Sequence, residues 1–234
     1  MTPERFASGM TFEQYMAFIG TPENLAREAG WWRGPERMDW SGPLRTWYGG
    51  LRLHDHQVEA IRWLAAQPSG PAKILVISEE WSSDCRRAVP PLARLAEAGG
   101  LELRIFPRDG LTVGREARAN PADSPNADLM SEFLRERDGR TYQSIPVVVF
   151  YTRGMEYLYH FTERPAIYHP DRLSGAMRAS RSGETAEETW ERFMREWAAM
   201  QRSPFFKVWA FAGIDEMLSA LYERIVLGRV ANCE

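Results

Sequence analysis

The stretch KILVISEEWSSDC, residues 73–85, decides the fold class of this chain. Its first part, Lys73–Ser78, is a short continuous apolar run rich in branched residues, which is typical of a strand buried on both faces of a parallel sheet. A helical stretch follows the turn and continues to Ala98, where Gly99-Gly100 ends it. The pattern predicts a strand–turn–helix unit inside an α/β domain.

The flanking sequence predicts further elements of both kinds. Apolar residues recur at helical spacing in several stretches, and short apolar or alternating runs indicate three more strands. The expected helices are 11–19, a second one that begins at Pro22, 54–66, 128–137, 185–200 and 203–227, and the expected strands are 101–106, 145–151 and 154–161. The remaining long stretches, 30–50, 107–127 and 162–183, are expected to be irregular, and the middle one is expected to be a long polar loop.

Three landmarks occur in a fixed order along the chain. Trp81 to Cys85 forms a Trp-x-x-x-Cys turn, Pro90 follows the cysteine by five residues, and Ser144-Ile145-Pro146 opens a strand. On these residues, the sequence resembles the thioredoxin family over residues 54–162. Family members carry Trp-Cys-x-x-Cys at the first landmark, a proline that kinks the helix at the second, and a cis-proline at the third.

The resemblance implies an α/β thioredoxin-like fold with extra helices at the N- and C-termini. It divides the chain into an N-terminal helical and irregular extension (1–53), a thioredoxin-like domain (54–202) and a C-terminal helical extension (203–234). The last two helices are expected either to pack on the core or to form a homodimer surface. The residues of that surface would be Phe205, Phe206, Trp209 and Phe211.

The resemblance also implies how this motif departs from dithiol chemistry. In the family, the first cysteine starts a helix, which favours its thiolate, and the second cysteine resolves the mixed disulfide. Ser82 occupies the first position here, and its hydroxyl cannot form a disulfide. Cys85 keeps the resolving sulfur. Asp84 beside it disfavours a thiolate, whereas Arg86 and Arg87 favour one.

Simpler interpretations compete with a chemical role for these residues. Cys85 is favoured as a small buried hydrophobic residue, a common fate of free cysteines. Ser82 is favoured as a helix N-cap. The family's buried acid in the preceding strand is replaced by Val76, so its help with proton transfer is missing. Cys233 is expected to be a frayed, exposed thiol, and its alternative role is that of a resolving partner for Cys85.

The resemblance therefore implies one candidate catalytic residue, Cys85, and a binding groove between the motif and the Ile-Pro turn. Ile145 would offer backbone groups to an extended chain, as in strand addition. The candidate binding residues are Trp81, Ser82, Ser83, Asp84, Ile145 and Pro146. A non-functional interpretation is favoured for two other polar groups. Arg108-Asp109 is interpreted as a solvated turn pair, and His54-Asp55-His56 as polar residues at a helix start.

Composition limits the classes of partner. The 234 residues carry a net charge of −3 with acids and bases well mixed, whereas a nucleic-acid surface needs a basic stripe. No stretch reaches the ~20 apolar residues that span a bilayer, and residues 1–20 lack the pattern of a signal peptide. We therefore expect a cytoplasmic protein with no nucleic-acid, membrane, metal or organic-cofactor partner. The nine tryptophans are interpreted as packing anchors.

Three functional hypotheses follow. The leading one is an atypical thioredoxin-like protein that binds protein or peptide partners and has little dithiol reductase activity. The second is a single-thiol redox enzyme, in which Cys85 attacks a disulfide or peroxide and glutathione or Cys233 resolves the product. The third is a structural scaffold in a complex, which would use the tryptophan-rich ends of the chain.

Overall fold

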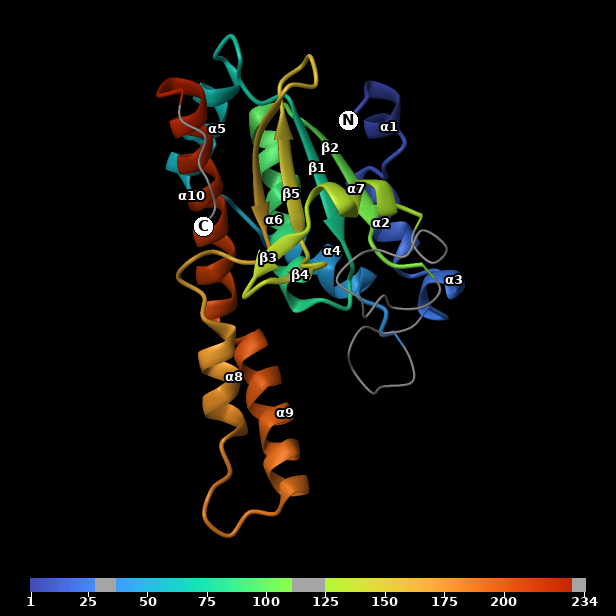
Figure 1. Ribbon diagram of the computed structural model, residues 1–234, viewed down its shortest axis with the longest axis vertical. Helices are drawn as coiled ribbons and strands as arrows, with labels where there is room; N and C mark the ends of the chain where they lie inside the picture. Colours follow the sequence, from blue (N-terminus) through green and yellow to red (C-terminus); the bar gives the residue numbers. More distant parts are fainter. Residues whose placement is uncertain (28–36, 111–124, 229–234) are drawn as a thin grey trace.

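A four-stranded mixed sheet forms the centre of the protein in the computed structural model, which describes residues 1–27, 37–110 and 125–228 (Figure 1). The strand order is β2-β1-β5-β6. Strand β1 pairs parallel with β2 and antiparallel with β5, and β5 pairs antiparallel with β6. The strands are β1 (Lys73–Ser78), β2 (Glu102–Pro107), β5 (Val147–Tyr151) and β6 (Tyr157–Thr162). The predicted α/β class and the four predicted strands are confirmed.

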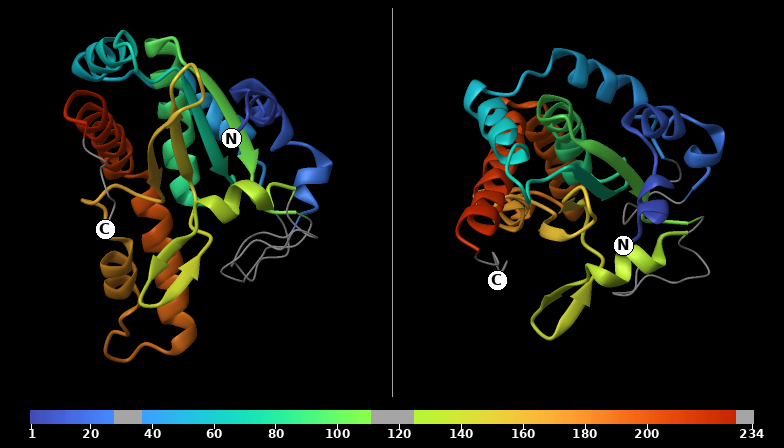
Figure 2. Two further views of the ribbon diagram at one scale, coloured as in Figure 1. Left: turned by 45° about the horizontal axis from the view of Figure 1, so that its top comes forward. Right: turned by 90° about the horizontal axis from the view of Figure 1, so that it is seen from above.

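Helices cover both faces of the sheet (Figure 2). Successive side chains of β1 enter different hydrophobic clusters: Ile74 and Val76 belong to one, and Leu75 and Ile77 to the other, because side chains alternate across a strand. Helices α5, α6 and α10 supply the first cluster, and α1 and α7 supply the second. These helices are α1 (Pro3–Ala7), α5 (Asp55–Ala65), α6 (Ser83–Gly99), α7 (Ala127–Glu132) and α10 (Pro204–Val226).

The N-terminal segment packs on the same core. Helices α2 (Phe12–Phe18) and α3 (Pro22–Leu25) begin at threonine caps. Tyr15 and Met16 of α2 are almost fully buried in the first cluster. The backbone of Met10 bridges to Ile105 of β2. Additional helices at both ends of the chain are therefore confirmed, whereas the domain boundaries at residues 53 and 202 stay predictions.

Two helices project from the body of the protein as an antiparallel arm (Figure 1). They are α8 (Pro170–Arg178) and α9 (Ala186–Arg202). Arg192 holds the arm together from within: its Nε lies 2.7 Å from Glu184 Oε1, and its Nη1 lies 2.7 Å from the carbonyl oxygen of Met177. The contacts of Arg192 thus link α9 to α8 and to the segment between them.

Three expectations about local structure were wrong. The segment 30–50 is not irregular throughout, because α4 (Ser41–Gly50) occupies its second half. Chain expected to be irregular at 162–183 contains α8, which Pro170 opens. The expected helix 128–137 stops at Glu132, and the hairpin of β3 (Arg135–Arg137) and β4 (Arg140–Tyr142) follows. Its turn is Asp138-Gly139, with φ of 51° and 71°, which is the backbone of a type I′ hairpin.

Three of the four aromatic residues of the expected dimer surface pack within the chain. Phe206, Trp209 and Phe211 pack inside the chain against Trp47, Tyr168 and His54, with ring centroids 5.2, 4.4 and 4.6 Å apart. Phe205 remains 59% exposed. Packing of the last helix on the core is confirmed, and a homodimer stays a prediction.

Leu221 tests whether α10 is part of the core. Its side chain is fully buried, so we expect Leu221→Ala to lower the free energy of unfolding by about 2–5 kcal/mol. The matched control is Leu227→Ala at the end of the same helix, where the side chain is 52% exposed, and we expect a change within about 0.5 kcal/mol. Urea unfolding measures both. Equal small losses would contradict the packing of α10 on the sheet.

Candidate functional site

The Trp81–Cys85 motif lies between the end of β1 and the first turn of α6. Ser82 is the N-cap of that helix: its backbone is extended, and its hydroxyl accepts a hydrogen bond from the backbone N–H of Cys85 at 3.4 Å. Gly100, with φ of 65°, ends the helix at its other end. Ser82 therefore has the capping role that its residue type predicts.

The sulfur of Cys85 points into the protein. The side chain is 1% exposed and belongs to the same hydrophobic cluster as Leu75, Ile77 and Ile145. Its Sγ accepts a hydrogen bond from the backbone N–H of Glu79 at 3.5 Å. Burial raises the pKa of the thiol to about 12, more than the surrounding hydrogen bonds lower it. A thiolate is therefore strongly disfavoured at neutral pH.

The two arginines after Cys85 are committed to other partners. Arg86 Nη1 donates to the carbonyl oxygens of Glu80 and Trp81, each at 2.8 Å. Arg87 pairs with the carboxylate of Asp84. The Arg86 bonds link α6 to the segment that follows β1. The positive charges do not overcome the cost of burying a thiolate.

The Ile145–Pro146 turn lies on the core side of the motif. Its peptide bond is cis, and both residues are buried. The carbonyl oxygen of Pro146 accepts a hydrogen bond from the backbone N–H of Glu163 at 2.7 Å. The turn thus approaches the Cys85 sulfur through a shared hydrophobic cluster, and its side chains do not line the open space in front of the motif.

That open space is a pocket of about 950 Å³, which we call the motif pocket. Trp81, Ser82, Ser83 and Asp84 form its floor, and the opposite walls come from α4, α8, α9 and the start of α10. Its aromatic lining comprises Trp40, Trp47, Trp81, Phe193, Trp197 and Phe206. Four of the six predicted binding residues therefore line the motif pocket, whereas Ile145 and Pro146 do not, although Trp81 packs against the hydrophobic cluster that contains Ile145.

Three carboxylates that form ion pairs with arginines line the motif pocket. Asp84 pairs with Arg87, and Glu163 lies 2.7 Å from Arg164, which also reaches Asp171 at 3.3 Å. Burial raises the pKa values of Asp84 and Glu163, and the neighbouring arginines oppose that effect. Arg86 lies over the ring of Trp40, 3.8 Å from its centroid.

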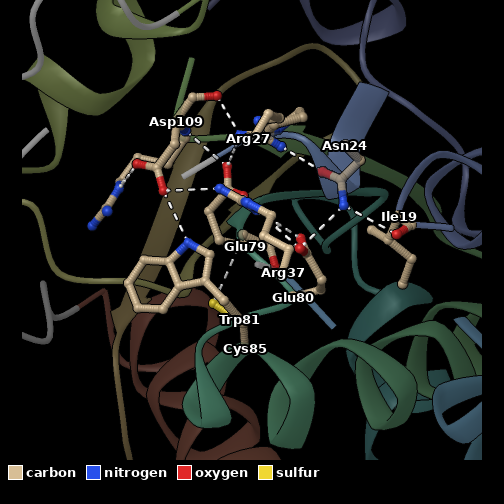
Figure 3. Close-up of polar contacts among 12 residues, drawn as sticks. Ile19, Asn24, Arg27, Arg37, Glu79, Glu80, Trp81, Cys85 and Asp109 are labelled. Atoms are coloured by element: carbon tan, nitrogen blue, oxygen red, sulfur yellow. Dashed lines mark hydrogen bonds and ion pairs between the residues drawn. The ribbon is translucent and has the colours of Figure 1, made fainter. Parts of the chain in front are cut away.

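A buried network of charges lies directly behind the motif (Figure 3). Arg37 Nη1 lies 2.7 Å from Glu79 Oε2 and 2.9 Å from Glu80 Oε1. Arg27 Nη2 lies 2.8 Å from Glu79 Oε1. Burial and the nearby Asp109 carboxylate raise the pKa of Glu79, whereas both arginines lower it. The network ties the N-terminal segment to the end of β1.

Asp109 extends the network to the motif itself. Its Oδ2 accepts a hydrogen bond from Trp81 Nε1 at 3.0 Å, and its backbone N–H donates to Glu79 Oε1 at 2.7 Å. Arg108 Nε lies 2.6 Å from Asp109 Oδ1, and both residues are buried. The expectation of a solvated turn pair at 108–109 was therefore wrong, because the end of β2 delivers both side chains inward.

Sequence reasoning missed most of the pocket walls. The available signal is the clustering of tryptophans near residues 40–47 and 190–197, for which packing is the favoured interpretation and a partner surface the alternative. Trp31, Trp32, Cys233 and most of the 107–127 loop lie outside the described residues. His54 caps α5, as its position at a helix start suggests. Within the described ranges, no group of three or more His, Cys, Asp or Glu residues is placed to hold a metal ion.

Comparison with known proteins supports the predicted family. Residues 37–120 match the model of a family described as thioredoxin. A crystal structure of a protein of unknown function from Pseudomonas aeruginosa is 19% identical, with a TM-score of 0.50 over 93% of this chain and 94% of the other. An HIV epitope-scaffold is 18% identical, with a TM-score of 0.49 over 97% of each chain. No curated protein matches the sequence.

The family match and the Pseudomonas aeruginosa structure support the fold and leave the activity open. The chain is thioredoxin-like, with additional helices, as its sequence predicts. The solved structures share too little identity to carry more than the fold. Among the described helices, none is long and apolar enough to cross a membrane.

Removal of Arg37 tests the buried network. Its side chain is fully buried between two carboxylates, so we expect Arg37→Met to lower the free energy of unfolding by about 3–5 kcal/mol. The control is Arg45→Met, which breaks an exposed pair with Glu13 and should cost less than about 1 kcal/mol. Urea unfolding of the three proteins decides. Similar losses of unfolding free energy in both variants would contradict the burial of the network, because they would mean that water solvates it.

The reactivity of Cys85 tests its burial. With a thiol pKa of about 12, only ~1 thiol in 10,000 is ionised at pH 8. We expect a Cys233→Ser variant to resist a chromogenic disulfide reagent when folded, and to react with one equivalent in guanidinium. The rate should keep rising with pH beyond 10. Fast labelling of the folded variant at pH 7 would contradict the buried, protonated thiol.

Proposed function

We propose that this thioredoxin-like chain is a peptide-binding protein without dithiol–disulfide reductase activity, and that a segment of a partner protein enters the motif pocket. The observation that carries this proposal is a division within the motif. Trp81 to Asp84 line a pocket of about 950 Å³, whereas the motif's one sulfur, on Cys85, is buried on the other side.

The chemistry of the motif supports a binding role over a redox role. Reduction of a disulfide by a dithiol needs two sulfurs that both lose an electron as the new disulfide forms. Ser82 supplies a hydroxyl at the nucleophile's position, and that hydroxyl caps α6. The remaining thiol of Cys85 is protonated and screened from solvent. Neither of the two motif positions therefore offers a ready nucleophile.

The lining of the motif pocket supports an apolar occupant. Large aromatic side chains dominate the binding energy of most interfaces, and pockets lined by them commonly measure about 300–1,000 Å³. Trp47 and Phe206 face each other in one wall, and Phe193 and Trp197 stand side by side in another. An apolar side chain of a partner would be surrounded by rings on several sides.

Contact at the Ile-Pro turn stays a prediction. Ile145 is 5% exposed, so strand addition at its backbone requires the surrounding chain to open. The proposal therefore places the first contact on the α4 and α9 side of the motif. A cytoplasmic location is retained as part of the proposal, and the proposed partner is a polypeptide alone.

Two other functions remain as alternatives. A single-thiol enzyme would need Cys85 to become accessible, after which glutathione or Cys233 would resolve the product. A scaffold would use exposed apolar side chains such as Trp190, which is 47% exposed, and Phe205. The scaffold role predicts a complex that survives a blocked motif pocket, which separates it from the proposed function.

A peptide selection tests the proposal. Random 12-residue peptides displayed on phage are selected against the immobilised protein, and enriched peptides are measured by fluorescence anisotropy. We expect Ala198→Trp, which fills the pocket from α9, to weaken the binding of enriched peptides ~10-fold or more. Ser174→Trp fills it from α8 and serves as a second blocking variant.

The matched control for this selection is Ala199→Trp. Ala199 lies on the same helix, is exposed and does not line the pocket, so binding should be unchanged. Circular dichroism verifies that each variant is folded. No enrichment, or enriched peptides that bind equally to folded Ala198→Trp and Ser174→Trp, would overturn the proposed function.

A further inference from the structure

Unpaired positive charges surround the mouth of the motif pocket. Arg178 of α8, Arg202 of α9 and Lys207 of α10 all line the pocket, and all three are exposed. Within the described chain, no carboxylate pairs with any of them, and the charge of Arg178 lies over the ring of Phe193, 4.4 Å from its centroid. The three residues, which we call the basic rim, come from three different helices.

The acidic residues of the same pocket do not neutralise the basic rim. Asp84, Glu163 and Asp171 all lie in ion pairs, which they form with Arg87, Arg135 and Arg164. The basic rim therefore leaves an excess of positive charge among the residues that line the pocket, although the whole chain carries a net charge of −3. Such a local excess of one sign favours partners of the opposite sign and speeds their approach.

One wall of the pocket carries an amide with no partner. Among the described residues, neither Oε1 nor Nε2 of Gln201 has a hydrogen-bond partner, and both atoms are screened from water. The indole N–H of Trp47, in the facing wall, is in the same state. Leaving buried polar groups unpaired costs free energy, which partners supplied by a ligand would restore.

These groups match the main chain of a peptide. A side-chain amide has one acceptor and donors of its own, so Gln201 can accept from one backbone N–H and donate to one carbonyl oxygen. Trp47 can donate to a further carbonyl oxygen. Because both are screened in the unbound protein, contact requires each side chain to turn toward the pocket.

We propose that the motif pocket selects an acidic peptide with an aromatic or aliphatic side chain at its centre. The apolar side chain occupies the aromatic walls, Gln201 and Trp47 bind the main chain, and Asp or Glu residues on either side meet the basic rim. This inference rests on the proposed function and names the class of peptide that the site takes.

The composition of the selected peptides provides the first test. Sequences enriched on the wild-type protein should place Asp or Glu within three residues of a large apolar side chain, well above their frequency in the starting library. The triple variant Arg178→Glu/Arg202→Glu/Lys207→Glu should weaken the binding of those peptides ~10-fold or more, and 0.5 M NaCl should weaken wild-type binding in the same direction.

Two controls separate charge from packing. Arg153→Glu changes an exposed arginine in the β5–β6 turn, which does not line the pocket, and should leave affinity unchanged. Gln201→Met keeps the size of the side chain and removes its amide. It should weaken the binding of the acidic peptides and of their Asn/Gln-substituted versions by the same factor. Circular dichroism verifies the fold of every variant.

The outcomes distinguish this inference from the proposed function. Peptides that lose binding to Ala198→Trp but lack acidic residues, or bind the triple variant as well as the wild type, would overturn the acidic class and leave the pocket as a peptide site. Enriched peptides that ignore both blocking variants would overturn both proposals.

Discussion

The site depends on the buried pairing of Arg37 with Glu79 and Glu80. Two adjacent carboxylates at the end of a core strand are costly to bury, and removal of one partner of such a pair leaves an uncompensated charge. Arg27 and Arg37 supply the opposite charges and tie their part of the chain to the end of β1. Asp109 accepts a hydrogen bond from the indole N–H of Trp81, which links the network to the motif. The motif is thus held in place by this network of buried charges and by the packing of Cys85 in the hydrophobic core.

This constraint divides the motif into two faces. The side chain of Cys85 lies in the hydrophobic cluster that also contains Leu75 and Ile77. Trp81 to Asp84 line the motif pocket, which α4, α8, α9 and α10 complete. Here added helices enclose it with tryptophans, and the serine at the nucleophile's position keeps only its capping role.

The sequence predicts the core of this fold well and the site poorly, for physical reasons. KILVIS is apolar at every position but its two ends, so its burial as a central strand is locally encoded, and the capping role of Ser82 follows from one side chain. An Asp-Gly pair can follow a helix or form a hairpin turn, so the sequence alone predicts a helix up to Arg137, whereas α7 stops at Glu132 and Asp138-Gly139 is the turn between β3 and β4. The pocket walls come from four helices far apart in the chain. Only tertiary packing brings Trp47 to Phe206, and only the end of β2 turns Asp109 inward.

The rate at which the protein reduces insulin disulfides with dithiothreitol as the electron source tests the central claim most directly. The motif that lines the pocket is proposed to have no redox role, so the account predicts a rate equal to that of dithiothreitol alone. It also predicts that Cys85→Ser leaves the rate unchanged. A rate above that background in the wild-type protein, abolished by Cys85→Ser in a folded variant, would contradict the account.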